Sequence, residues 1–165
     1  MPKTIFDNCV LSNFALSDSL DIVEKLYANK SYVTNYVVAE NMQGILKGHL
    51  NLSRLKSALD KGWLKEVTLN SRKEKGIFEM LSVSLGMGES SSIAVAKIRS
   101  FIFACDDRAA RREAEFQNVK LTGTIGILIK AVKKRIMTRK IADDTLNQMI
   151  RNGFYSTIKS IDEVI

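Results

Sequence analysis

The sequence contains few of the residues from which the commonest small active sites and metal sites are built. Its 165 residues include one proline, one histidine and two cysteines. With a single histidine, His49, His-rich zinc sites are excluded and a serine or cysteine catalytic triad is hard to assemble. Cys9 and Cys105 form no CxxC spacing, which favours two reduced, buried thiols over a metal or redox motif. Any hydrolytic chemistry must therefore come from carboxylates.

Long hydrophobic runs are also missing. No apolar stretch is long enough for a signal peptide or a membrane span, so we expect a cytoplasmic protein that makes no use of a membrane. Hydrophobic residues make up 45% and charged residues 26%, which is typical of a globular chain rather than a disordered one. No repeat or linker interrupts the order, and residues 1–165 are predicted to form a single domain.

Positive charge, in contrast, is abundant. The chain has 25 lysines and arginines against 18 aspartates and glutamates, a formal net charge of +7. Such an excess favours a polyanionic partner, with nucleic acid first and an anionic membrane surface second.

Hydrophobic patterning predicts strands that alternate with helices. A parallel sheet with right-handed crossovers follows from this order, and we expect a three-layer α/β/α sandwich with four to five central strands. The predicted strands cover residues 4–6, 32–34, 63–69, 101–105 and 119–122. The predicted helices cover residues 10–16, 21–27, 36–46, 51–61, 71–85, 90–96, 107–116, 125–134 and 142–151.

Acidic residues follow two of the predicted strands. Asp7 ends the first strand, and Asp106 and Asp107 end the apolar strand at 101–105. Ligands bind at the carboxyl ends of strands in open parallel sheets, and Glu40 and Glu89 are candidates to reach the same edge. Carboxylates that share a pocket repel each other unless a cation neutralises them. Oxygen ligands without histidine or cysteine indicate Mg²⁺ or Mn²⁺, which can activate water for attack on a phosphodiester.

Each acid also has a purely structural explanation. Asp7 can cap a helix, Glu89 sits where a helix N-terminus favours an anion, and Glu40 can belong to a solvated helix face. Asp106 and Asp107 can form a turn and an N-cap. Composition and spacing leave both interpretations open.

Five short motifs occur in series along most of the chain. Together they resemble the PIN-domain family, and in particular its VapC-like branch of small prokaryotic proteins. The GxGE, DDRAAR and TGTxGIL elements in series carry most of the specificity. The motifs are IFDNCVLSNF at 5–14, VVAENMQG at 37–44, LGMGES at 85–90, DDRAAR at 106–111 and LTGTIGIL at 121–128.

The resemblance implies a metal-dependent ribonuclease in which an acidic quartet holds one or two Mg²⁺ or Mn²⁺ ions. Asp7, Glu40 and Glu89 match the first three catalytic acids of the family. Asp107 best matches the fourth, and Asp106 assists or replaces it as a metal ligand. By the same resemblance, the protein would be a homodimeric toxin of a toxin–antitoxin pair, and an antitoxin protein would cover the acidic pocket.

One position departs from the family pattern. Asn8 follows the first aspartate, where the family usually has serine or threonine. An amide can still hydrogen-bond a carboxylate or a substrate, so we assign Asn8 to the nucleic-acid contacts. The departure keeps an alternative open, a PIN-like module that binds RNA or protein and cleaves weakly or not at all.

Basic residues near the acids are candidates for RNA binding. Arg108 and Arg111 directly follow the aspartate pair, and Lys133 and Lys134 belong to a dense basic run. Such side chains position RNA through its phosphates without reading its sequence. A solvated helix face explains the lysine run equally well, and Arg111 can instead pair with one of the clustered acids.

Overall fold

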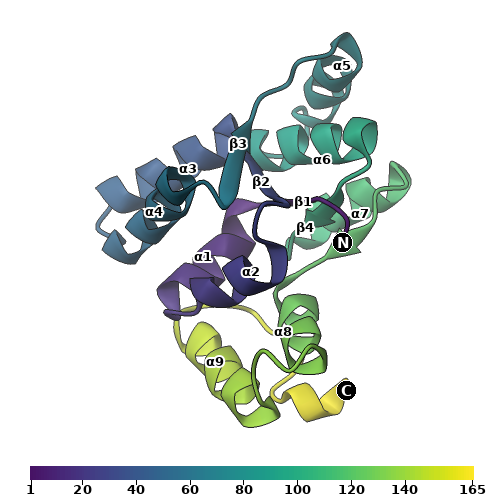
Figure 1. Ribbon diagram of the computed structural model, residues 1–165. Coiled ribbons are helices and arrows are strands. Elements are labelled where there is room, and N and C mark those ends of the chain that lie inside the picture. The colour runs from purple at the N-terminus through teal and green to yellow at the C-terminus, as the bar shows by residue number, and fades with distance from the viewer.

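The computed structural model describes residues 1–165 and contains a five-stranded sheet in which all neighbouring strands are parallel. The strand order is β3-β2-β1-β4-β5, with β1 at the centre (Figure 1). The predicted parallel sheet is therefore confirmed. The strands are β1 Thr4–Phe6, β2 Ser31–Thr34, β3 Leu64–Val67, β4 Ile102–Ala104 and β5 Leu121–Thr122.

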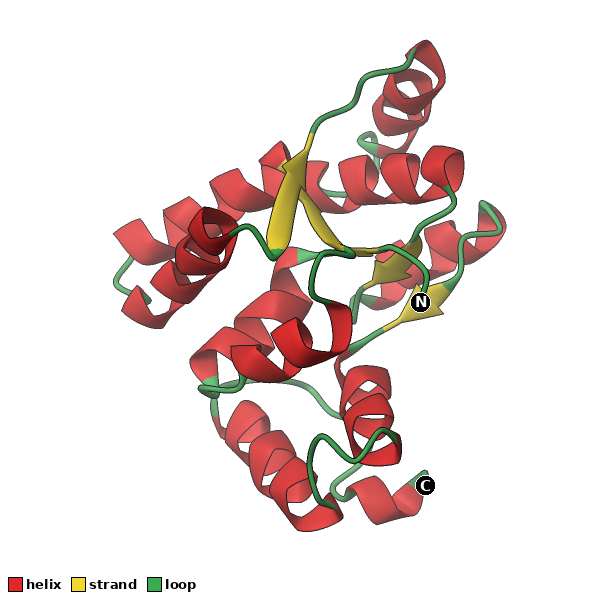
Figure 2. Ribbon diagram, viewed as in Figure 1, coloured by secondary structure: helices red, strands yellow, loops and turns green.

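Nine α-helices connect and cover the strands, and they lie on both sides of the sheet (Figure 2). This arrangement confirms the three-layer α/β/α architecture. No helix is both long enough and apolar enough to cross a membrane. The helices are α1 Asn8–Leu16, α2 Leu20–Tyr27, α3 Asn35–Leu46, α4 Ser53–Lys61, α5 Arg72–Leu81, α6 Met87–Arg99, α7 Arg108–Phe116, α8 Thr124–Lys133 and α9 Arg139–Arg151, with short 3₁₀ helices η1 Leu50–Leu52 and η2 Ile161–Glu163.

The central strands β1 and β4 bury side chains on both faces, which explains their largely apolar sequences. Phe6 and Ala104 contribute to a large core with α1, α2, α8 and α9. Their neighbours Ile5 and Phe103 point to the opposite face, where they pack with α6 and α7. The large core reaches from β1 to Ile161 in η2, so residues near both ends of the chain share it.

Several helices begin earlier than predicted, and the shifts of α1 and α6 affect the acids. α1 begins at Asn8, which places Asp7 at its N-cap position with extended backbone angles. α6 begins at Met87 rather than at residue 90, because Gly86 serves as its N-cap. Glu89 therefore lies in the first turn of α6, where the helix dipole favours a negative charge.

The orientation of α3 differs from the one that its sequence predicts, in which Val38, Met42, Ile45 and Leu46 form one buried apolar stripe. Met42 and Leu46 are exposed, and the helix buries Val37 and Asn41 instead. The Asn41 amide donates a hydrogen bond of 3.2 Å to the Leu52 carbonyl, so a polar side chain fixes this helix to η1. Only the donor side of this amide is satisfied, since Asn41 Oδ1 is buried without a hydrogen-bond partner.

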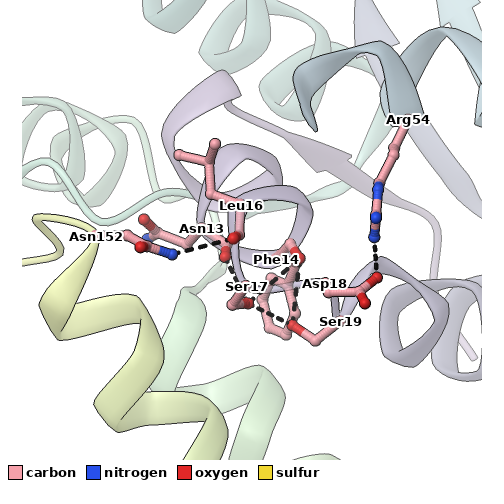
Figure 3. Close-up of polar contacts among 8 residues, drawn as sticks. All are labelled: Asn13, Phe14, Leu16, Ser17, Asp18, Ser19, Arg54 and Asn152. Atoms are coloured by element: carbon pink, nitrogen blue, oxygen red, sulfur yellow. Dashed lines mark hydrogen bonds and ion pairs between the residues drawn. The ribbon is translucent and has the colours of Figure 1, made fainter. Parts of the chain in front are cut away.

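The loop after α1 ties distant helices together (Figure 3). The Asn152 amide at the end of α9 donates a 3.0 Å hydrogen bond to the Leu16 carbonyl. On the other side of the loop, Arg54 of α4 forms an ion pair with Asp18. These contacts fix the C-terminal end of α1, and α1 begins directly after Asp7.

Candidate active site

Four separate elements bring acidic residues to the carboxyl-end edge of the sheet. Asp7 follows β1 and is 4% exposed, and its N–H donates to the Ala104 carbonyl at 2.9 Å, which continues the ladder with β4. Asp107 follows β4, Glu40 lies in α3 and Glu89 in α6. All four of these predicted residues interact electrostatically across the edge.

Glu40 is held against the start of α6. The Gly88 N–H donates a 3.1 Å hydrogen bond to Glu40 Oε1. A Cβ atom on Gly88 would lie 2.8 Å from Glu40 Cδ, so any side chain at this position would displace the Glu40 carboxylate. The second glycine of the GxGE motif therefore makes room for the carboxylate and supplies a donor to it.

The electrostatics of the four acids show a local excess of negative charge. Burial raises the pKa of Asp7, and the nearby charge of Asp107 adds to this effect. Burial and the charge of Asp7 raise the pKa of Glu40. The pKa of Glu89 rises to about 7, first through burial and then through Asp7 and Asp107. A cation at this edge would relieve the repulsion.

The adjacent Asp106 has different surroundings from Asp107. Asp106 Oδ1 accepts a hydrogen bond from the Thr124 N–H at 2.9 Å, and Oδ2 accepts bonds from the Thr124 hydroxyl and from the Asn13 amide at 3.2 Å. Asp107 caps α7 by accepting from the Ala110 N–H at 2.9 Å. Asp106 thus joins α1, β4 and α8, whereas Asp107 faces the charges of Asp7 and Glu89.

Three further polar atoms near this edge are buried without a hydrogen-bond partner. They are Asn8 Oδ1, Asn35 Oδ1 and Ser90 Oγ. Asn8 follows Asp7, Asn35 follows the end of β2, and Ser90 follows Glu89. Our sequence reasoning missed Asn35 and Ser90, although a polar residue directly after a strand or a candidate acid was a signal for both. Orphaned oxygens of this kind suit a bound ion or its water shell.

Arg111 does not form the ion pair with an acid that the sequence offered as an alternative to its contact with RNA. Its Nη1 donates to the carbonyls of Cys105 at 2.7 Å and Thr122 at 3.1 Å, and it forms no ion pair with an acid. It therefore joins the ends of β4 and β5. Arg108 and Arg112 are exposed and line a groove beside Asp106.

The lysine run lies away from the acids. Lys133 and Lys134 are exposed at the end of α8, while α8 begins near Asp106 at Thr124. The pKa of the N-terminal amino group is lowered by Lys30 and, at longer range, by Lys134. Since the N-terminus precedes β1, these lysines lie toward the edge of the sheet opposite to Asp7. The structure does not bring them together with the acids.

A comparison of the sequence with protein-family models finds a match over residues 3–165 to a family described as PIN domain. The chain belongs to the PIN-domain family. The motif resemblance in the sequence is thereby confirmed at the level of the family.

Two solved structures share the fold of this PIN domain. One is VapBC2 from Rickettsia felis bound to a DNA fragment from their promoter, with 18% identity, a TM-score of 0.53 and coverage of 73% of this chain and 97% of that chain. The other is PAE2754 from Pyrobaculum aerophilum, with 14% identity, a TM-score of 0.52 and coverage of 80% and 98%. At these identities the likeness concerns the fold. No curated protein matches the sequence.

The oxygen donors of the PIN domain fit a hard divalent cation. Carboxylates are the ligands that Mg²⁺ and Mn²⁺ prefer, and Asp7, Glu40, Glu89 and Asp107 supply them without a paired lysine or arginine. The four carboxylates do not form one compact shell, because no three of them lie within 4.8 Å of one another.

Two thiols lie on the other side of Asp7. The ligand atoms of Asp7, Cys9 and Cys105 all lie within 4.8 Å of one another. Cys9 Sγ donates to Asp7 Oδ2 at 2.9 Å, and Cys105 Sγ lies 3.9 Å from the same oxygen. Both cysteines are free, Cys105 is fully buried as predicted, and Cys9 is half-buried. Sulfur is a poor ligand for Mg²⁺, so the thiols stand apart from the oxygen donors.

Proposed function

We propose that this PIN domain is a metal-dependent endoribonuclease in which Asp7, Glu40, Glu89 and Asp107 hold Mg²⁺ or Mn²⁺. The observation that carries the proposal is the convergence of four carboxylates from four elements on one sheet edge. Burial, and after it the charges of Asp7 and Asp107, raise the pKa of Glu89 to about 7, as expected for an acid that lacks a compensating cation. Perturbed acids at a sheet edge are typical of functional sites.

The protein supplies position and charge to the proposed reaction. A bound divalent ion lowers the pKa of a water molecule and stabilises the charge that develops on the attacked phosphodiester. Asp7 is fixed at the end of β1, and the Gly88 N–H orients Glu40. Asp106 holds α8 against β4 through Thr124, and we assign it a positioning role beside Asp107.

RNA would approach the acids over the start of α7. Arg108 and Arg112 are exposed beside Asp106, where they can attract phosphates toward the acidic edge. Asn8 is next to Asp7, and its buried Oδ1 has no partner, so its amide would reach a substrate hydroxyl after rotation of the side chain. Contacts from Lys133 and Lys134 require an RNA long enough to reach the opposite edge of the sheet.

Cleavage of a panel of structured RNAs tests the proposal. We expect endonucleolytic products with Mg²⁺ or Mn²⁺, none with EDTA, and none from the Asp7→Asn variant. RNA affinity, measured separately without metal, should persist in that variant. Binding by the wild-type protein without cleavage at any concentration of either ion would instead favour the binding-module alternative.

A protein partner completes the proposal. Met80, Val83 and Met87 are exposed apolar side chains in the ten residues before Glu89, which suits a partner that covers the acidic edge. We propose that this partner is an antitoxin and that the nuclease is a homodimeric toxin. Co-expression with the product of the adjacent open reading frame should yield a complex without ribonuclease activity. A complex that cleaves as fast as the free nuclease would contradict the antitoxin role.

A further inference from the structure

We propose that Asp7, Cys9 and Cys105 form a separate binding site for a soft divalent cation, with Zn²⁺ as its physiological ligand. Occupation of this site would withdraw Asp7 from the oxygen ligands and inhibit the nuclease. The binding of Zn²⁺ follows from the three side chains alone, and the inhibition rests on the function proposed above.

The three ligand atoms already have separations close to those of a zinc site. In tetrahedral zinc sites, bonds of about 2.3 Å to sulfur and about 2.0 Å to oxygen set neighbouring ligand atoms roughly 3.5–3.8 Å apart. Asp7 Oδ2 lies 2.9 Å from Cys9 Sγ and 3.9 Å from Cys105 Sγ, and the sulfurs lie within 4.8 Å of each other. A shift of well under 2 Å in the separation of any two ligand atoms would therefore produce the spacing of a tetrahedral zinc site.

The backbone holds the ligands in place without the metal. Cys9 lies in the first turn of α1, two residues after Asp7, and Cys105 directly follows β4. Hydrogen bonds from the Asp7 N–H to the Ala104 carbonyl and from the Cys105 N–H to the Thr122 carbonyl fix both segments to the sheet. Because these positions exist before binding, the metal need not organise them.

Charge and burial favour a cation at this position. Asp7 is 4% exposed and forms no ion pair with a lysine, arginine or histidine. Cys105 is fully buried, while half-buried Cys9 leaves a path to solvent. Zn²⁺ would bind two thiolates and one carboxylate, with a water molecule as fourth ligand, and both thiol protons would pass to solvent.

The ligand types separate this site from the Mg²⁺ site. Thiolates select Zn²⁺ and Cd²⁺ over Mg²⁺, whereas Glu40, Glu89 and Asp107 offer only oxygen. Asp7 is the one side chain shared by both sets. A carboxylate oxygen bound to Zn²⁺ and moved toward the sulfurs would contribute less to Mg²⁺, so the two ions should compete.

Titration of the reduced, metal-free protein with Cd²⁺ tests the binding step without RNA. We expect one equivalent of Cd²⁺ to produce a sulfur-to-metal charge-transfer absorption band, and Zn²⁺ to displace it with release of protons. The Cys9→Ala variant should bind at least 10-fold more weakly. Cys105→Ala should do the same, and circular dichroism would verify that this buried substitution leaves the protein folded.

A charge-transfer band that is absent at stoichiometric Cd²⁺ would overturn the proposal, as would a band of unchanged size in folded Cys9→Ala. The inhibition is tested by Zn²⁺ titration of Mg²⁺-supported RNA cleavage, with each protein normalised to its own rate without Zn²⁺. We expect Cys9→Ala to need at least 10-fold more Zn²⁺ for half-inhibition than the wild-type protein. Equal sensitivity of the two proteins would overturn the inhibitory role, and an absence of cleavage in any condition would overturn the proposed nuclease while the Cd²⁺ result stands.

Discussion

The two sides of the acidic edge use carboxylates in different ways. On the β4–β5 side, Asp106 accepts hydrogen bonds from three donors in α1 and α8 and serves as a structural link. On the α3–α6 side, Glu40 accepts one bond from Gly88, and Glu89 has a pKa near 7. The difference in the number of donors fits the proposed roles, a link between elements for Asp106 and metal ligands for Glu40 and Glu89.

Removal of the Asp7 charge should have the largest effect on the α3–α6 side. We expect Asp7→Asn to reduce Mg²⁺-dependent RNA cleavage about 1000-fold, because it removes the acid that interacts with both Glu40 and Glu89. Thermal unfolding would verify that the variant is folded. Cleavage within 10-fold of the wild-type rate would contradict the assignment of Asp7 to the metal.

Substitution of the two adjacent aspartates should separate activity from stability. Asparagine caps helices as well as aspartate does, so Asp107→Asn should retain the stability of α7 and reduce cleavage about 100-fold. Asp106→Asn should cost about 1–3 kcal/mol of stability, because an amide cannot accept all three bonds. Denaturation measures stability, and single-turnover cleavage measures activity. A loss of stability in Asp107→Asn together with a loss of cleavage in stable Asp106→Asn would show that the two aspartates have exchanged roles.

The position of Glu40 can be tested through its neighbour. A methyl group in Gly88→Ala would displace the carboxylate, and we expect a loss of cleavage of about 10-fold to 100-fold. Gly76→Ala is the matched control, since open space surrounds that position in α5, and it should stabilise the helix by up to about 1 kcal/mol. Similar activity in both variants would show that the contact with Gly88 does not matter.

The raised pKa of Glu89 predicts a pH dependence of stability in EDTA. Glu89 titrates near 7 when folded and near its ordinary value of 4.5 when unfolded, so the folded state holds more protons between these values. Stability should therefore fall as the pH rises through this window, by about 1 kcal/mol for a half-exposed group. The fall should be smaller in Glu89→Gln, where only the raised pKa values of Asp7 and Glu40 contribute to it, and saturating Mg²⁺ should reverse it. Urea denaturation from pH 5 to 8 measures both, and identical curves for the variant and the wild-type protein would contradict the assignment.

The smallest expected effect concerns RNA affinity. It compares the arginines near the acids with the lysines at the opposite end of the strands. Loss of Arg108 and Arg112 together should reduce the slope of log affinity against log salt by about 1 for each arginine. Loss of Lys133 and Lys134 should change the affinity for a short RNA by less than the arginine pair. Filter binding across a salt series compares the two double variants, and a larger effect of the lysines would place the RNA on the opposite edge.

Much of the fold could be predicted because the strands have a simple pattern. Apolar runs such as residues 101–105 are typical of strands buried on both faces, and alternation with helices predicts a parallel sheet. The orientation of α3 could not be predicted. Asn41 is buried and donates a hydrogen bond to the Leu52 carbonyl, and the hydrophobic periodicity of a helix does not indicate such a contact.

The chemistry of the acidic edge could be predicted only in part. Order and motif indicated Asp7, Glu40, Glu89 and the aspartate pair. The division of roles between Asp106 and Asp107 depends on Thr124 and Asn13, which approach from other elements, and spacing along the chain does not reveal them. The contact between Arg111 and two carbonyls was equally hidden, because an arginine beside acids favours an ion pair as a simple expectation.

Direct binding of Mn²⁺ is the most direct test of the metal site proposed at the acidic edge. Electron paramagnetic resonance of free Mn²⁺, recorded during titration of the wild-type protein and of the Asp107→Asn and Asp106→Asn variants, reports how much ion each protein holds. We predict that Asp107→Asn weakens Mn²⁺ binding at least about 10-fold, and that folded Asp106→Asn stays close to the wild-type protein. Mn²⁺ binding that is unchanged in Asp107→Asn, or absent from the wild-type protein, would contradict a metal site formed by Asp7, Glu40, Glu89 and Asp107.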